Sequence, residues 1–205
     1  MGDAYINQKL TLNNNFILKK MLNNIKNVDI LKDFLESILE IKISNIILKP
    51  SLKEESESIK NHNICSLKVF TEKGNEINIG IQIINGCYIE SKILLYCANI
   101  YKEIQYSNNE KIVTINILDF KYLNSKSYHT KFELYRNSIQ EAIYEIHILE
   151  LPKFTITNKE NITKKEVWIA FLNGDDKIID FNNKEYEQIK ILNNLLNNYW
   201  KSEIL

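Results

Sequence analysis

Glycine and proline are scarce in this chain of 205 residues, which has five glycines and two prolines. No glycine-rich loop suited to cradling phosphate groups is present, which argues against a nucleotide-binding fold. The three cysteines, Cys65, Cys87 and Cys97, are odd in number and lack CxxC spacing. The sequence therefore indicates neither a disulfide framework nor a zinc site, and it favours the reducing cytoplasm as the compartment.

An excess of charge of either sign is also lacking, because 26 Lys and Arg residues balance 26 Asp and Glu residues. Without a global positive field, strong nonspecific binding to nucleic acid is disfavoured. No segment reaches the roughly 18 continuous apolar residues of a membrane span. The first ten residues, MGDAYINQKL, lack the apolar run of a signal peptide. We expect a soluble, cytoplasmic protein that does not associate with a membrane.

Hydrophobic residues make up 44% of the chain, enough for one sizeable core. Their spacing predicts alternating helices and strands, with a charged loop at 51–63 and a turn at Thr71–Asn75. The predicted helices cover 13–24, 28–39, 88–105, 163–174 and 184–205, and the predicted strands cover 41–48, 64–70, 76–84, 111–120, 128–136 and 142–154. The strand at 111–120 is nearly continuous in apolar residues, which predicts a central position. This order predicts a mixed α/β architecture.

One strand contains an unexpected residue. In EINIGIQ, residues 76–82, isoleucine alternates with polar residues until Gly80 occupies a position where a polar side chain is expected. A glycine inside a strand costs about 0.5–1 kcal/mol relative to alanine. It usually marks a bulge, a close approach of another backbone, or a lost side chain.

Several segments in succession resemble one known family. NNNFILKKML, DILKDFLESIL, INIGIQ, LYCANIYKEIQ, INILDF and YEIHILELPKF follow one another as in the PD-(D/E)XK nuclease family transposases, also called recombination-promoting nucleases. The resemblance covers about residues 10–155 and implies a restriction-endonuclease-like core, a mixed sheet with flanking helices, and Mg²⁺-dependent cleavage of DNA. We therefore divide the chain into a nuclease-like domain, 1–155, and a helical C-terminal extension, 156–205.

The same resemblance implies that the catalytic motif is degenerate. Aligned on the turn glycine and the INI run, the family's aspartate falls on Ser66 and its glutamate on Gly80, while Gln82 is kept. An acidic residue of the first helix falls on Asn15. We predict that Ser66 and Gly80 lie on adjacent antiparallel strands and face one pocket, near Asn15 and Gln82. No catalytic residue, metal or other cofactor is expected there.

Two alternatives stay open for other polar residues. A relocated Mg²⁺ site could use Glu90, Asp119 and Gln82, with Glu90 the best replacement ligand. On the helix at 88–105, two tyrosines and two lysines could stack bases and pair phosphates, although a role at the edge of the core is the commoner one. These residues are Lys92, Tyr96, Tyr101 and Lys102. The histidines, His62, His129 and His147, lack metal-ligand spacing.

The resemblance leads to one functional hypothesis and one competitor. A nuclease fold that has lost its acids can act by binding: it can occupy a nucleic acid, pair with an active relative, or block a nucleic-acid-handling enzyme. Because the family travels with mobile elements, an anti-CRISPR protein that inhibits an RNA-guided effector is a concrete version. The competing hypothesis is a weak Mg²⁺-dependent DNA nuclease with relocated ligands.

Overall fold

The computed structural model describes residues 28–48, 64–84, 88–104, 111–136, 139–156 and 161–203. The predicted helix at 13–24 and the loop at 51–63 lie outside the described residues. The chain divides into two compact units. Residues 42–153 form a sheet unit, and the residues up to 41 together with those from 154 onward form a helical unit.

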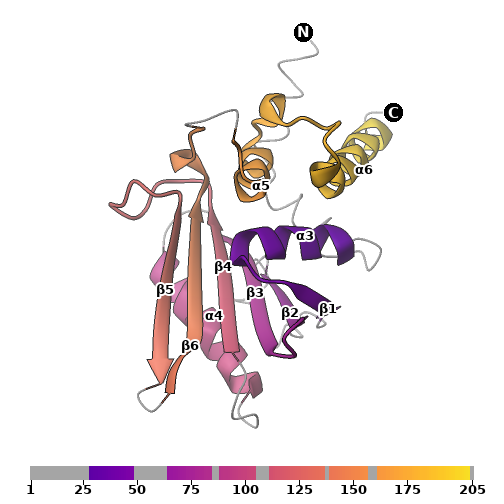
Figure 1. Cartoon of the computed structure of the whole chain (residues 1–205). Helices are drawn as coiled ribbons and strands as arrows, with labels where there is room; N and C mark the ends of the chain where they lie inside the picture. The colour runs from indigo at the N-terminus through magenta and orange to yellow at the C-terminus, as the bar shows by residue number, and fades with distance from the viewer. Residues whose placement is uncertain are drawn as a thin grey trace. The chain divides into compact units, whose positions relative to one another are not determined.

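The sheet unit is a six-stranded mixed sheet in the order β1-β2-β3-β4-β6-β5 (Figure 1). The strands are β1 Ile43–Leu48, β2 Ile64–Thr71, β3 Glu76–Ile84, β4 Lys111–Leu118, β5 His129–Arg136 and β6 Ile139–Glu150. The first three form an antiparallel meander, and β3, β4 and β6 run parallel. Strand β4 lies between β3 and β6 and is buried, which confirms its predicted central position. The α/β class is confirmed as well.

The hairpin between β2 and β3 closes through a short turn. Gly74 adopts a φ of 82°, in the left-handed region that favours glycine. Across the turn, Thr71 donates its backbone N–H to the carbonyl of Asn75 at 2.9 Å, and its hydroxyl accepts from Asn75 N at 3.0 Å. This turn fixes the register of the two strands.

Helix α4, Ile89–Ile104, connects β3 to β4 and packs on one side of the sheet. Its residues Ile89 and Ile93 join Ile84, Leu118 and Ile148 in a buried cluster. Because side chains alternate along a strand, the even-numbered residues of β3 and β4 share this side. We call it the α4 side of the sheet.

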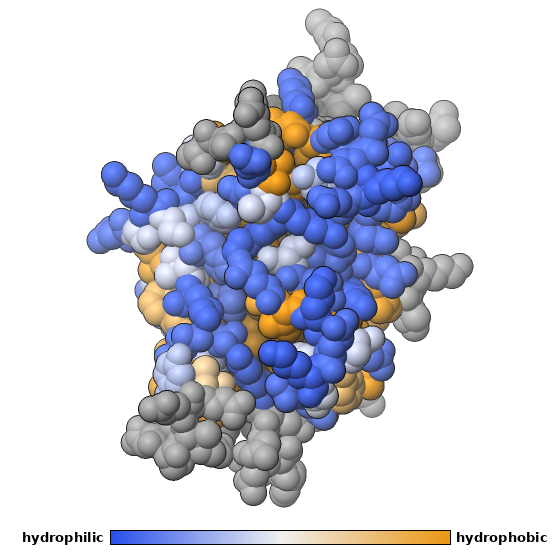
Figure 2. Space-filling model, in the orientation of Figure 1, coloured by the Kyte–Doolittle hydropathy of each residue, from blue (hydrophilic) through white to orange (hydrophobic). Residues whose placement is uncertain are grey.

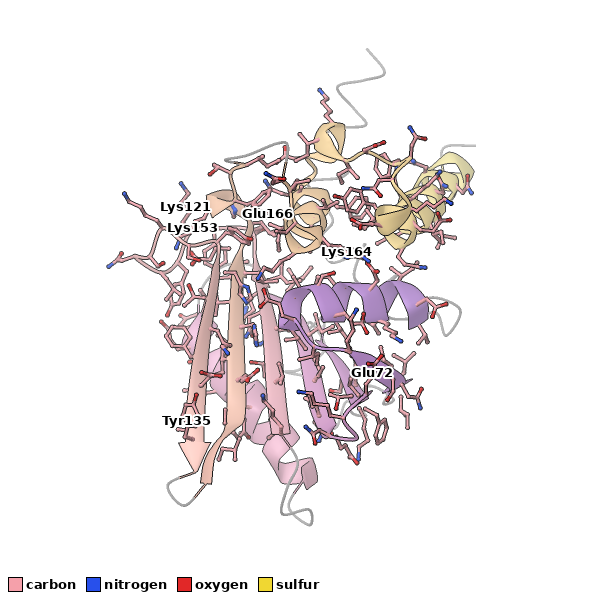
Figure 3. All side chains as sticks on the ribbon, in the orientation of Figure 1. Glu72, Lys121, Tyr135, Lys153, Lys164 and Glu166 are labelled. Carbon is pink, nitrogen blue, oxygen red and sulfur yellow. The ribbon has the colours of Figure 1, made fainter. Side chains whose placement is uncertain are left out.

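The helical unit contains α3 Val28–Leu39, α5 Lys164–Asn173 and α6 Glu187–Glu203, and α3 contacts both other helices. The rings of Phe34 and Trp168 meet edge to face with centroids 5.4 Å apart. Asp33 accepts a hydrogen bond from Trp168 Nε1 at 2.9 Å and pairs with Lys164, which is labelled on α5 in Figure 3. The C-terminal helices α5 and α6 thus pack with α3. The predicted domain boundary at residue 155 places α3 in one domain and these two helices in the other. Of the helices that the structure describes, none is long and apolar enough to cross a membrane.

A buried ion pair fixes the connection that follows β4. Glu150 and Lys153 form it at 2.6 Å, with side chains 0% and 7% exposed. Glu150 also accepts from the backbone N–H groups of Tyr122 and Leu123, and Lys153 Nζ donates to the carbonyl of Leu123 at 2.6 Å. Segment 121–123 is therefore held against the end of β6, where Figure 3 labels Lys121 and Lys153.

Replacing Glu150 with alanine should lower the free energy of unfolding by about 3–5 kcal/mol, because it leaves the Lys153 ammonium buried without its partner. Urea unfolding measures the change. The matched control is Asp119→Ala, which removes an exposed carboxylate nearby and should change stability by less than about 0.5 kcal/mol. Equal effects of the two substitutions would contradict a structural role for the pair.

Candidate functional site

Ser66 and Gly80 lie directly opposite each other on β2 and β3. The antiparallel register runs without a shift from Ile64 opposite Gln82 to Phe70 opposite Glu76. Ser66 and Gly80 therefore face the same side of the sheet, the α4 side, which confirms the predicted pairing. Asn15, the third position of the motif, lies outside the described residues.

Two ordinary reasons for a glycine inside a strand do not apply to Gly80. The regular pairing on β2 and an equally regular parallel pairing with Thr114 on β4 exclude a bulge. Positive φ occurs among the described glycines at Gly74 and Gly174, not at Gly80. Neither a bulge nor a left-handed backbone conformation therefore accounts for the glycine at position 80.

The side chains at these positions do not fit a Mg²⁺ ion. Hard cations in proteins are held by oxygen ligands that include at least one or two carboxylates. Ser66 offers a neutral hydroxyl and Gly80 offers no side chain. Within the described part of the chain, no group of three or more His, Cys, Asp or Glu side chains is placed to hold a metal ion.

Gln82 belongs to a buried chain of hydrogen bonds. Its Nε2 donates to Asn116 Oδ1 at 2.6 Å, and Asn116 Nδ2 donates to Thr114 Oγ1 at 3.2 Å and to the carbonyl of His147 at 3.0 Å. Gln82 is 2% exposed, and Thr114 and Asn116 are fully buried. The amide nitrogen of Gln82 thus takes part in a buried internal hydrogen bond, as is usual for a polar side chain inside a sheet.

The site predicted from the sequence did not include Thr114 and Asn116. The signal was available in VTINIL, residues 113–118, where polar residues alternate with isoleucine inside an apolar strand. The same pattern in β3 contains Asn78, Gly80 and Gln82. Two parallel strands with polar residues at matching positions predict a polar row between them.

Helix α4 is attached to the same row through Cys97. The Cys97 thiol hydrogen-bonds to Thr114, the neighbour of Gly80 on β4, and the carbonyl of Cys97 accepts from Tyr144 Oη at 3.1 Å. Burial raises the pKa of this thiol above its ordinary value, and the hydrogen bond to Thr114 opposes that shift. Cys97 is therefore a protonated packing residue at neutral pH rather than a reactive thiolate.

The proposed replacement ligands do not gather around Gln82. Glu90 is exposed and accepts a hydrogen bond from the hydroxyl of Tyr122, which lowers the Glu90 pKa and raises that of Tyr122. Asp119 is exposed at the end of β4. Gln82 is buried and bonded to Asn116. The structure therefore does not bring the three residues of the relocated site together.

The predicted binding residues are only partly described. Lys92 lies on α4 and is half-buried. Tyr96, Tyr101 and Lys102 belong to the same helix, but their side chains lie outside the described part of the structure. Base stacking by these tyrosines stays a prediction.

Strands β5 and β6 bring together two histidines that are separated in sequence. His129 Nε2 lies 2.9 Å from His147 Nδ1, and His147 Nε2 lies 3.4 Å from Glu145 Oε2. Lys111 pairs with the other oxygen of Glu145 at 2.5 Å. The hydrogen bond to His147 is the main cause that lowers the pKa of Glu145 to about 2; Lys111 adds to it and burial opposes it.

Asn116→Ala should lower the free energy of unfolding by about 1–3 kcal/mol, because the Gln82 amide and the carbonyl of His147 then lose a buried partner. Chemical denaturation measures the loss. Asn116→Ala combined with Gln82→Leu should recover part of it, since the buried donor is removed too. A double variant less stable than Asn116→Ala would contradict this account of the network.

The Glu145 pKa generates a prediction about acid stability. A carboxyl group with a pKa of about 2 in the folded chain and 4.5 ordinarily stabilises the fold above pH 4.5. That stabilisation is lost as the pH falls from 4.5 toward 2. Glu145→Gln should therefore flatten the pH dependence of unfolding in this window. Parallel urea titrations of both proteins at several acidic pH values test it, and identical pH slopes would contradict the assignment.

Comparison with known proteins identifies the family. A family model described as PD-(D/E)XK nuclease family transposase matches residues 12–202, and the match continues through α5 and α6 beyond the motifs that end near residue 155. No curated protein matches the chain, and no solved structure matches it. The mixed six-stranded sheet with flanking helices is consistent with the restriction-endonuclease-like fold of that family. The chain thus belongs to the PD-(D/E)XK nuclease family transposases.

Proposed function

We propose that this chain is a catalytically inactive member of its family that acts by binding. The observation that carries the proposal is the direct pairing of Ser66 with Gly80 in an unshifted register. Hydrolysis of a phosphodiester by this fold needs carboxylates at the two positions to hold a divalent ion, which lowers the pKa of water and neutralises the leaving oxygen. The hydroxyl of Ser66 and the absent side chain of Gly80 cannot replace the two carboxylates that would hold the ion.

The state of Gln82 supports the same conclusion. In a working site, this position must present a polar group to the water or the phosphate. Here its amide donates to Asn116 at 2.6 Å within a network that is closed by Thr114 and the carbonyl of His147. Gln82 would have to give up this bond before its amide nitrogen could contact a substrate.

The alternative nuclease with relocated ligands receives no comparable support. Glu90, its principal acid, is exposed and bonded to Tyr122, whereas Gln82 is buried on β3. Because ligands of one ion must converge within about 2–2.6 Å of it, the described positions would have to rearrange.

The charge balance favours a protein, or a protein bound to nucleic acid, over bare nucleic acid as the partner. Basic and acidic residues number 26 each, so phosphate neutralisation is not a global property of the chain. Figure 2 shows a face on which hydrophilic residues predominate, with small hydrophobic patches between them. We propose a nucleic-acid-handling protein as the partner, with inhibition of an RNA-guided effector as the concrete version.

Restoring the acids tests the inactivity. Ser66→Asp with Gly80→Glu should introduce divalent-ion binding, detected as a rise in thermal stability on addition of Mg²⁺ or Mn²⁺, and weak metal-dependent nicking of plasmid DNA. The wild type should show neither. Recovery will be partial, because groups that orient metal ligands contribute about 10–100-fold and have not been restored.

The matched control is Ser66→Asn with Gly80→Gln, which has nearly the same volume without charge and should not respond to metal. The proposal is wrong if the wild type cleaves DNA with Mg²⁺ and Glu90→Ala abolishes that cleavage. The proposed binding function is tested by a pull-down in which the wild type and the Ser66→Asp, Gly80→Glu variant each serve as bait. Both should retain the same partner, because binding is proposed not to depend on these two positions.

A further inference from the structure

Strand β5 forms an outer edge of the sheet, with β6 on one side and no strand of the described chain on the other (Figure 1). An edge strand presents unpaired backbone N–H and C=O groups, which are a template for another strand. Figure 3 shows Tyr135 on β5 along this edge.

The edge strand lacks part of the usual protection. Residues 131–135 are all exposed, and three of them are large and apolar: Phe132 at 47%, Leu134 at 59% and Tyr135 at 52%. Proteins commonly blunt such an edge with proline, a bulge or charged side chains, lysine above all. Strand β5 contains no proline, and its charged residues alternate in sign, as Lys131 and Glu133, so an antiparallel second copy can pair with them.

The irregularities in this part of the sheet lie in β6 rather than β5. Between Leu134 and Tyr135 the partner changes from Tyr144 to Ala142, so the additional residue belongs to β6. At the next step, from Tyr135 to Arg136, the partner changes from Ala142 to Ile139. Strand β5 itself therefore advances without an inserted residue, which leaves its outer edge regular.

We propose that the outer edge of β5 pairs with β5 of a second copy of this chain, antiparallel and centred on Phe132. In this register Lys131 lies opposite Glu133 of the second copy, and Glu133 lies opposite its Lys131. The two Phe132 side chains meet at the two-fold axis, and Leu134 packs beside Thr130. The two six-stranded sheets become one continuous sheet.

Charge complementarity selects both the partner and the register. Within one chain, Lys131 and Glu133 already pair at 2.8 Å on the same side of the strand. Two copies centred on Phe132 place each of these four charges opposite a charge of the other sign on the second copy, whereas within each chain Glu133 lies opposite Glu145 of β6. Centring the pair on Lys131 places lysine opposite lysine, and centring it on Glu133 places glutamate opposite glutamate, both of which are destabilising.

The proposed interface is small. Stable dimers bury about 1,200–2,000 Å² in total, and one short strand pair supplies only part of such an area. We therefore expect reversible dimerisation in the micromolar range, resting on backbone hydrogen bonds, the Phe132 contact and the cross-strand ion pairs.

Charge reversal tests the register. Sedimentation equilibrium of the full chain should show a monomer–dimer equilibrium. Lys131→Glu or Glu133→Lys alone should weaken dimerisation about tenfold or more, because each replaces two opposite-charge pairs with two like-charge pairs. Combining both substitutions in one chain should restore it. Mixing the two single variants should give a heterodimer, since one carries two acids and the other two bases at the interface.

Thermal unfolding of each variant serves as the folding control. Phe132→Asp, at an exposed position, should abolish the dimer while leaving the monomer folded. The proposal is overturned if the wild type stays monomeric across the micromolar range. It is overturned too if the single reversals dimerise as tightly as the wild type, or if the mixed variants fail to associate.

Discussion

The burial of β3 and β4 along almost their entire length is the constraint on which the sheet unit depends. A strand that is buried on both faces can keep a polar side chain only if another side chain or backbone group bonds to it. Gln82, Asn116 and Thr114 satisfy one another in this way. The same constraint makes a carboxylate costly on these strands unless a cation or another charged partner accompanies it.

The sequence was sufficient to predict the local pairing. The Lys-Gly turn and the alternation of isoleucine predict the antiparallel hairpin of β2 and β3, and the family resemblance selected Ser66 and Gly80 as the positions that face each other across it. The polar network of Asn116 could not be predicted with the same rigour. It depends on the parallel register of β3 and β4, which a long connection through α4 leaves undetermined. The pairing of His129 with His147 depends likewise on the register of β5 and β6.

For the helices, too, the sequence pattern predicts where each helix lies in the chain but not which other helix it packs against. The sequence pattern located α3, α5 and α6 and indicated an apolar face on α3 and α6, whereas α5 is buried at six consecutive residues, 167–172. It could not indicate that α3 packs with the two C-terminal helices, because an amphipathic helix fits any apolar surface of suitable shape. What specifies the partner is a set of polar contacts, above all the hydrogen bond from Trp168 to Asp33, and such pairs are not visible in hydrophobic spacing.

The link between Asp33 and Trp168 joins residues separated by 135 positions. On the ribosome, α3 leaves the exit tunnel long before α5 is synthesised. The sheet unit, whose residues 42–153 are contiguous, is complete while α3 still lacks its helical neighbours. Domains generally fold as units during synthesis, and contacts between distant residues form slowly. The helical unit is therefore expected to be the last part of the protein to form, because it is incomplete until α5 and α6 have been synthesised.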